Sequence, residues 1–226
     1  MKRKEYELIE KYMQECMKDS AHDKEHVYRV LYNALDIAKY ETGVDYDVLI
    51  AACLLHDIGR PEQYADPTLS HADVGAEKAF RFLTENGYGE DFAKNVEYCV
   101  QKHRFRQSAP PETLESKILF DADKLDVAGA LGIARTLLYQ GIVGEPLYNI
   151  LPDGKVSDGT SDDDPSFFQE YKFKLEKMYD RFFTERGRAL AASRQHSAVS
   201  FYNDLLAETR ESVEGGAEML ENIIEK

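Results

Sequence analysis

A histidine and an aspartate, His56 and Asp57, stand side by side at the end of the apolar stretch LLHDIGR (residues 54–60). Burying an uncompensated charge is costly, so buried imidazoles and carboxylates are usually paired with each other or with a metal ion. Adjacent residues of a helix point only ~100° apart, so both side chains can reach one cation. The carbonyl groups of a last helical turn also favour positive charge. The pair therefore indicates a polar site inside the protein.

The other histidines gather in the same half of the chain, and only His196 lies elsewhere. His26 and His103 each fall on the apolar stripe of an expected helix, which directs them to the interior. Asp123 also lies on the apolar side of its helix, whereas Asp121 is rotated ~200° away. At least three ionisable groups from three helices are therefore expected to meet.

A single histidine on an apolar helix face is more often a hydrogen-bonded side chain of the core than a metal ligand. The whole set is harder to explain in that way. Helical bundles commonly build metal sites from histidine and carboxylate side chains that project inward from different helices. The combination favours a metal site.

The elements that must position these groups are all helical, because apolar residues recur at three- and four-residue steps and alternating stretches are nearly absent. Asp45 and Ser70 are suitable N-caps, and Gly43 and Gly87 are suitable stops. The expected helices cover about residues 4–19, 24–42, 45–59, 70–86, 91–103, 111 to beyond 123, 165–186 and 188–210.

We expect one helical domain over residues 1–226, with the site residues within about 20–135. The segment of about 141–166 is rich in Gly, Pro, Asp and Ser and is expected to be a long loop, and helices follow over about 165–226. Loops of this length are often lids, binding loops or disordered segments.

Composition excludes several classes of protein. The formal net charge is −14, with 42 acidic and 28 basic residues, which argues against binding to polymeric nucleic acid. A charged N-terminus and the lack of a long apolar run predict a cytoplasmic protein without a membrane segment. Three cysteines without metal-type spacing are expected to be reduced. An oligomer is possible, but nothing in the sequence indicates one.

The ordered set His26, His56-Asp57 and Asp123 resembles the signature of the HD-domain superfamily of metal-dependent phosphohydrolases. The likeness is close around AHDKEHVYRV, LLHDIGR and LFDADKLDVAGALGIAR, and covers about residues 20–135. It implies a helical bundle of the HD type, in which these four residues hold a divalent metal ion.

Two further histidines, His71 and His103, occupy places similar to those of the additional ligands in two-metal members such as the HD-GYP phosphodiesterases and bacterial diadenosine tetraphosphate hydrolases. Asp57 would then bridge the two ions. His71 is also compatible with a simple surface imidazole. Neither an HHE nor a GYP motif follows, so the resemblance does not imply a cyclic-di-GMP phosphodiesterase.

The mixed imidazole and carboxylate set suits Mn, Fe, Co, Ni or Zn better than Ca, with Mg as a further candidate. One site is expected, and a second is possible. In similar proteins the lysine at the place of Lys124 contacts substrate phosphate, although a solvated surface charge is an equal alternative. Arg60 and Arg104 are candidates for attracting a phosphorylated substrate. His22 is a candidate general acid or substrate contact.

The activity that these features predict is hydrolysis of a nucleotide or another small phosphate ester or anhydride by metal-activated water, with Asp57, Lys124 and His22 as the catalytic residues. One alternative is a di-iron oxygenase resembling myo-inositol oxygenase. Another is a metal-binding sensor or scaffold without catalytic activity.

Overall fold

The computed structural model describes residues 1–17, 24–104 and 110–224. Within these ranges the regular structure is helical, apart from one isolated bridge between Ile150 and Val156. The all-α prediction is confirmed. Contacts divide the chain into an N-terminal unit (Met1–Asp126 and Phe182–Gly187) and a C-terminal unit (Val127–Arg181 and Arg188–Lys226). A single HD-type domain over residues 1–226 stays a prediction.

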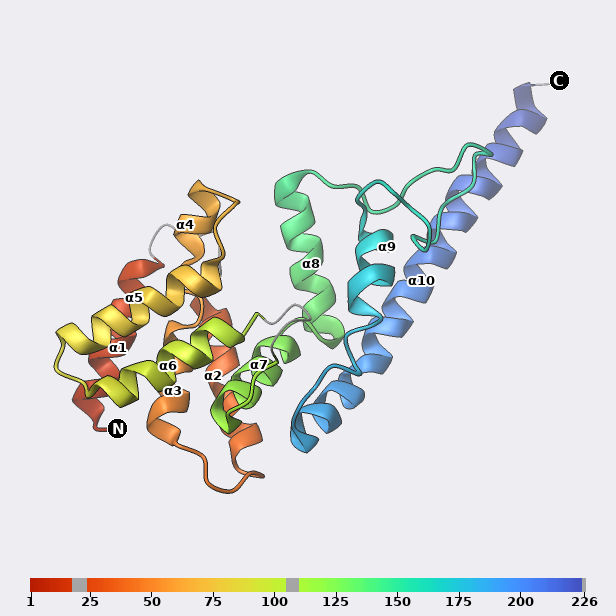
Figure 1. Cartoon of the computed structure of the whole chain (residues 1–226). Coiled ribbons are helices and arrows are strands. Elements are labelled where there is room, and N and C mark those ends of the chain that lie inside the picture. The colour runs from red at the N-terminus through yellow and green to blue at the C-terminus, as the bar shows by residue number, and fades with distance from the viewer. Residues whose placement is uncertain (18–23, 105–109, 225–226) are drawn as a thin grey trace. The chain divides into compact units, whose positions relative to one another are not determined.

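The N-terminal unit packs its helices around α3, which spans Tyr46–Leu55 (Figure 1). Every residue of α3 from Val48 to Leu55 except Ile50 is buried. A helix that is apolar on all sides has to lie inside the protein, and α3 contacts five of its neighbours in this unit. The helices of the unit are α1 (Arg3–Cys16), α2 (Lys24–Ala38), α3 (Tyr46–Leu55), α4 (Arg60–Ala65), α5 (His71–Glu85), α6 (Glu90–Lys102) and α7 (Leu114–Leu125).

Local signals in the sequence set several of these helix ends. The Asp45 carboxylate accepts hydrogen bonds from the amides of Asp47 and Val48 at the start of α3, and the Ser70 hydroxyl accepts one at the start of α5. Both caps were expected. The short helix α4 was not expected, since no helix was predicted between residues 59 and 70. Proline in the first turn of a helix is favourable because its missing N–H would have had no helical partner.

Gly59 also brings the start of α5 against the end of α3. A Cβ atom on Gly59 would lie 2.3 Å from the carbonyl oxygen of His71 and 2.7 Å from the amide nitrogen of Gly75. Only glycine allows the two backbones to come this close. As a result, His71 lies next to the residues that follow α3.

Asp121 fixes a distant part of the chain to α7. Its fully buried carboxylate accepts hydrogen bonds from the backbone N–H groups of Phe183 (2.9 Å) and Thr184 (2.7 Å) and from the Thr184 hydroxyl (2.6 Å). The guanidinium of Arg186 binds Asp36 of α2 at 2.8 Å. For this reason residues 182–187 belong to the N-terminal unit.

The C-terminal unit contains α8 (Gly129–Val143), α9 (Phe167–Glu170), the π-helix η1 (Tyr171–Leu175) and most of α10 (Glu185–Ile224) (Figure 1). Residues 144–166 between α8 and α9 contain the isolated bridge and turns. Aromatic and aliphatic side chains form the core of this unit: Ile133, Val156, Phe167, Phe168, Tyr171, Leu175, Ala198 and Tyr202.

Three expected helices differ from the structure. The helix expected to continue past Asp123 does so only to Leu125, and a separate helix that was not expected, α8, starts at Gly129, which has a φ of +67°. The helix expected over 165–186 is wrong beyond Leu175, because the backbone around residues 183–184 bonds to Asp121 instead of to its own helix. The last helix runs to Ile224 instead of 210. Over the described residues, no helix is long and apolar enough to cross a membrane.

Candidate metal centre

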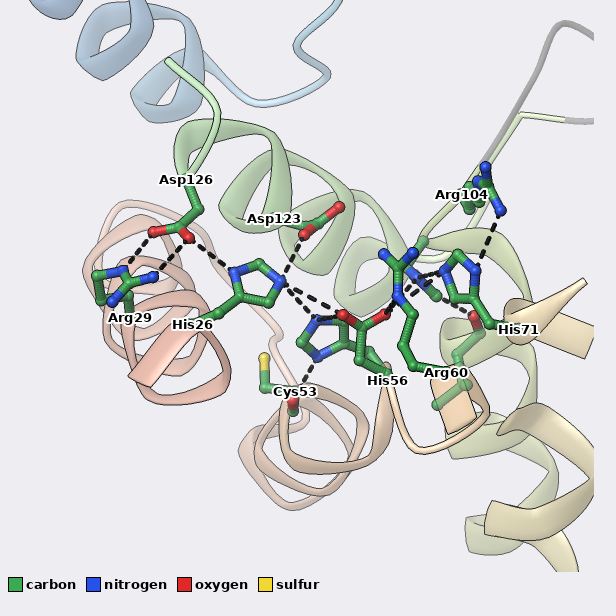
Figure 2. A network of polar contacts seen from close by, with 12 residues as sticks. His26, Arg29, Cys53, His56, Arg60, His71, Arg104, Asp123 and Asp126 are labelled. Carbon is green, nitrogen blue, oxygen red and sulfur yellow. Dashed lines mark hydrogen bonds and ion pairs between the residues drawn. The ribbon is translucent and has the colours of Figure 1, made fainter. Parts of the chain in front are cut away.

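The residues predicted as metal ligands all lie at or near helix ends of the N-terminal unit (Figure 2). All of them are buried except Asp123, whose side chain is 27% exposed. Their places are the first turn of α2 for His26, the C-cap of α3 and the next residue for His56 and Asp57, the first residue of α5 for His71, the C-cap of α6 for His103 and the last turn of α7 for Asp123.

These residues form two groups of three that could hold a metal ion. We call His26, His56 and Asp123 the first triad, and Asp57, His71 and His103 the second triad. Within each triad, one ligand atom from every residue lies within 4.8 Å of the others. Asp121, in contrast, faces residues 183–184, as the expected rotation away from Asp123 requires.

Donor atoms of the first triad lie close together. The Nε2 atom of His26 is 3.3 Å from the Nε2 atom of His56 and 3.3 Å from an oxygen of Asp123. The Oδ2 atom of Asp57 is 3.6 Å from His26 Nε2 and 3.7 Å from His56 Nε2. Three imidazole or carboxylate groups of this triad and one oxygen of Asp57 therefore face a common point.

The second triad has the same compactness. The Nε2 atoms of His71 and His103 are 3.2 Å apart. The Oδ1 atom of Asp57 lies 3.5 Å from His71 Nε2 and 3.6 Å from His103 Nε2. Since Oδ2 of the same carboxylate faces the first triad, Asp57 stands between the two groups, as the ligand that bridges two ions does.

The spacing of these donors fits a metal ion. Ligand atoms ~2.1 Å from a shared ion are separated by about 3.0 Å in octahedral and about 3.4 Å in tetrahedral coordination. The closest pairs of donors in both triads are 3.2–3.3 Å apart. Imidazole nitrogen and carboxylate oxygen are also common ligands of divalent transition metals. The residues present could therefore hold a divalent metal.

The far side of each histidine ring is already hydrogen-bonded. The Nδ1 atom of His26 lies 2.7 Å from Asp126, that of His56 lies 2.7 Å from the carbonyl of Cys53, and that of His103 lies 2.5 Å from the carbonyl of Val100. Because these partners are acceptors, Nδ1 carries the proton and donates it in each case. In the neutral ring, Nε2 then presents a lone pair to the triad, which is the usual orientation of a histidine that binds a metal.

His71 is oriented by a side chain of α4. Its Nδ1 atom lies 2.8 Å from the side-chain oxygen Oε1 of Gln63, whose amide NH₂ group donates to the backbone carbonyl of Leu69 at 2.9 Å. This second bond fixes the orientation of the Gln63 amide, so Nδ1 of His71 is the donor. Arg104 Nη1 lies 3.1 Å from the same Nδ1 atom. It is therefore a neighbouring positive charge and not a second hydrogen bond to that nitrogen.

The charges of the site perturb its pKa values strongly. Burial by itself would raise the pKa of Asp57, but the neighbouring histidines and Arg60 lower it well below its usual range. Burial lowers the pKa of His56 to about 4. Burial also acts to lower the pKa of His26, but hydrogen bonds to Asp123 and Asp57 outweigh it and raise the pKa. A buried cluster with shifts of both signs is typical of a functional site.

Three predicted substrate contacts lie at different distances from the triads. Arg60 Nε donates to the Oδ1 atom of Asp57 at 2.9 Å, and Arg104 lies beside His71. The ammonium of Lys124, next to Asp123 in the sequence, lies 4.7 Å from the centre of the Phe120 ring. His22 lies outside the described residues.

Sequence reasoning missed the partners that hold the ligands. The carboxylate of Asp126 accepts from His26 and also from Arg29, whose Nε lies 2.7 Å from Oδ1 (Figure 2). Helical spacing could have identified them, because Asp126 follows Asp123 by three residues and Arg29 follows His26 by three, which places each pair on one helix face. Gln63 gave no comparable signal.

Comparison with known proteins places these residues in a family. The profile of the HD domain matches residues 24–128, which include every described ligand. YpgQ of Bacillus subtilis (strain 168) is 29% identical over 208 residues, which are 89% of this chain and 92% of YpgQ. A crystal structure of that protein in complex with ADP has a TM-score of 0.68, with 90% of this chain and 97% of that one covered, at 27% identity.

A second solved structure is more similar in sequence. It is described as a predicted HD superfamily hydrolase from an uncultured Thermotogales bacterium, is 31% identical, and has a TM-score of 0.59. The similarity covers 91% of this chain and 92% of that one. Because this likeness spans nearly the whole of both chains and the family profile spans the residues that build the two triads, this chain belongs to the HD-domain superfamily.

Proposed function

We propose that this protein is a metal-dependent phosphohydrolase that acts on a nucleotide or another small phosphate ester or anhydride. The observation that carries the proposal is the pair of triads, in which four histidine Nε2 atoms and two carboxylates converge while every Nδ1 atom is hydrogen-bonded elsewhere. Such a cluster suits a divalent cation better than it suits packing, because a histidine of the core needs only one or two partners.

The two triads and the side chains that orient them have different roles in this proposal. The first triad would hold one divalent ion and the second triad another, with Asp57 shared between them. When bound, a pair of divalent ions lowers the pKa of water and polarises the phosphoryl oxygens of the substrate. Asp126 and Gln63 keep the rings of His26 and His71 in the orientation that ligation requires.

Positive side chains beside the cluster bind and orient the substrate phosphate. Arg60 and Arg104 lie at the second triad. Lys124 lies on the same helix as Asp123, the ligand that is partly open to solvent. His22, which lies outside the described residues, is proposed as the proton donor to the leaving group. These cations attract a small anion locally, although the chain as a whole carries a charge of −14.

The relatives support both the hydrolase activity and the nucleotide substrate of this proposal. Similar structures from a Thermotogales bacterium and from Bacillus thuringiensis are described as HD superfamily hydrolases, and the second is 28% identical with a TM-score of 0.68. The structure of YpgQ with ADP supports a nucleotide as the ligand class. A nucleoside diphosphate contains the anhydride that the proposed reaction would cleave.

The decisive experiment combines metal analysis with an activity screen. The purified chain is analysed for bound metals, loaded in turn with Mn²⁺, Co²⁺, Ni²⁺, Zn²⁺ or Mg²⁺, and tested on nucleoside mono-, di- and triphosphates and dinucleoside polyphosphates. We expect release of phosphate or pyrophosphate in at least one metal form. The double variant His56→Ala with Asp57→Ala should lose both metal and activity.

A histidine outside the cluster provides the matched control. His196 is exposed on α10, and His196→Ala should keep the metal content and the turnover of the wild type. A folded, fully metal-loaded protein that is inert towards the whole panel would contradict the proposal. Activity that survives in the double variant would contradict it as well.

A further inference from the structure

The two triads differ in the charges that stand behind their histidines. In the first triad, His26 donates to the carboxylate of Asp126 at 2.7 Å, and the triad contains the carboxylate of Asp123. Arg29 offsets part of this charge by binding Asp126. The carboxylate of Asp126 lies between Arg29 and the ring of His26. The groups in closest contact with the ligands of the first triad are therefore negative.

In the second triad the groups in closest contact are neutral or positive. His71 donates to the uncharged amide of Gln63 and has the guanidinium of Arg104 at 3.1 Å. Asp57 is the only carboxylate of this triad, and the oxygen that it offers is already bound by Arg60 at 2.9 Å. A divalent ion ligated by this oxygen would lie within a few ångströms of a fixed positive charge.

We propose that the first triad binds a divalent ion tightly by itself, whereas the second triad binds one tightly only together with a phosphate group, which neutralises Arg60 and Arg104. The inference rests on the proposed function, because the phosphate would normally be that of the substrate. Its consequence is that the two-ion centre is completed by the arrival of the substrate and that the free protein holds mainly one ion.

This coupling follows from the arrangement of charges. The Arg60 side chain is 24% exposed, so its guanidinium, although bound to Asp57 through Nε, can also reach an anion from solvent. A phosphate placed beside Arg60 and Arg104 brings negative charge next to the second triad and removes the repulsion that a second ion would meet. By linkage, an ion in the second triad must strengthen the binding of phosphate by the same factor.

The test measures binding without turnover. The metal-free protein is titrated with Mn²⁺ in chloride buffer and in buffer with inorganic phosphate at equal ionic strength, and free Mn²⁺ is counted by electron paramagnetic resonance. We expect one tight ion in chloride. With phosphate, the second ion should bind at least about tenfold more tightly, a typical size for the effect of groups around a metal site.

Two variants test whether the second ion binds at the second triad, and a third variant is the control. His71→Ala should keep the first ion and lose both the second ion and the phosphate effect, which also controls for complexes of Mn²⁺ with phosphate in solution. Arg60→Met should tighten the second ion in chloride by about tenfold and reduce its dependence on phosphate. Arg81→Met, an exposed arginine of α5, is the matched control and should behave as the wild type.

Two ions of equal affinity in chloride would overturn the inference, and so would a second ion whose affinity ignores phosphate. Binding of a single ion in both buffers would also overturn it. All three results leave the proposed function intact, provided that the metal-loaded protein hydrolyses a nucleotide. A protein that binds no divalent ion at all would instead refute the proposed function itself.

Discussion

The variant Asp121→Asn is expected to lower the free energy of unfolding of the metal-free protein by about 3 kcal/mol. Asp121 is fully buried and accepts from the N–H groups of Phe183 and Thr184 and from the Thr184 hydroxyl. All of these partners lie more than sixty residues away in the sequence. The interaction therefore holds the returning segment 182–187 on α7.

The magnitude follows from the geometry of the two oxygens. Oδ2 accepts from the Thr184 amide (2.7 Å) and hydroxyl (2.6 Å), and Oδ1 is the nearer partner of the Phe183 amide (2.9 Å). An asparagine can keep its oxygen at one position only, so its NH₂ group must face an N–H donor at the other. One hydrogen bond to a charged group is lost, at about 1.5–3 kcal/mol, and the remaining two weaken as the charge disappears.

Asp123→Asn is a matched control, since it makes the same substitution two residues away on the same helix. Asp123 is 27% exposed and lies 3.3 Å from His26, so its loss should change the stability of the metal-free protein by about 1 kcal/mol or less. Urea unfolding in EDTA, followed by circular dichroism, measures both variants. In the presence of Mn²⁺ the order should reverse, because Asp123→Asn loses a ligand whereas folded Asp121→Asn keeps the metal.

The reasoning would be refuted if Asp121→Asn unfolded within about 0.5 kcal/mol of the wild type, which is the usual effect of a surface substitution. Equal destabilisation by the two variants in EDTA would refute it too. In that case the loss would reflect the general sensitivity of α7 and not the anchoring of residues 182–187.

Further predictions concern metal binding and the pH dependence of the stability of the metal-free protein. Asp126→Asn should weaken binding of the first ion by about 10- to 100-fold in calorimetric titration, while exposed Asp91→Asn should not, and equal affinities would exclude a positioning role. Removal of the metal with EDTA should lower the melting temperature, and Mn²⁺ at 100 times its Kd should restore about 2.7 kcal/mol; an unchanged melting curve would contradict metal binding to the folded state. His56 and His71 should cost the metal-free protein about 4 kcal/mol of stability between pH 7 and pH 5, because they have lowered pKa values in the folded state and take up protons only on unfolding. The raised pKa of His26 acts in the opposite direction and offsets part of this loss, and stability that increases steadily towards pH 5 would contradict the assignment.

Much of the local structure could be predicted from the sequence because its causes are local. Apolar spacing identified α2, α3, α5 and α6 to within a few residues, apart from the last turn expected for α2. Asp45 and Ser70 capped their helices as expected, since a capping side chain binds amides only two or three residues away. The candidate ligands could also be predicted from local spacing. Spacing places these ionisable groups on apolar helix faces, where a buried charge requires a partner.

The tertiary structure alone decided how those groups combine. Which histidines pair across each triad, which oxygen of Asp57 faces which pair, and that Arg60 binds one of these oxygens all depend on how helix ends from distant parts of the chain approach each other. The same holds for Asp121, whose partners begin at residue 183. A sequence pattern reports the face on which a side chain lies, but contacts over long separations depend on packing, and only packing makes the two triads electrostatically different.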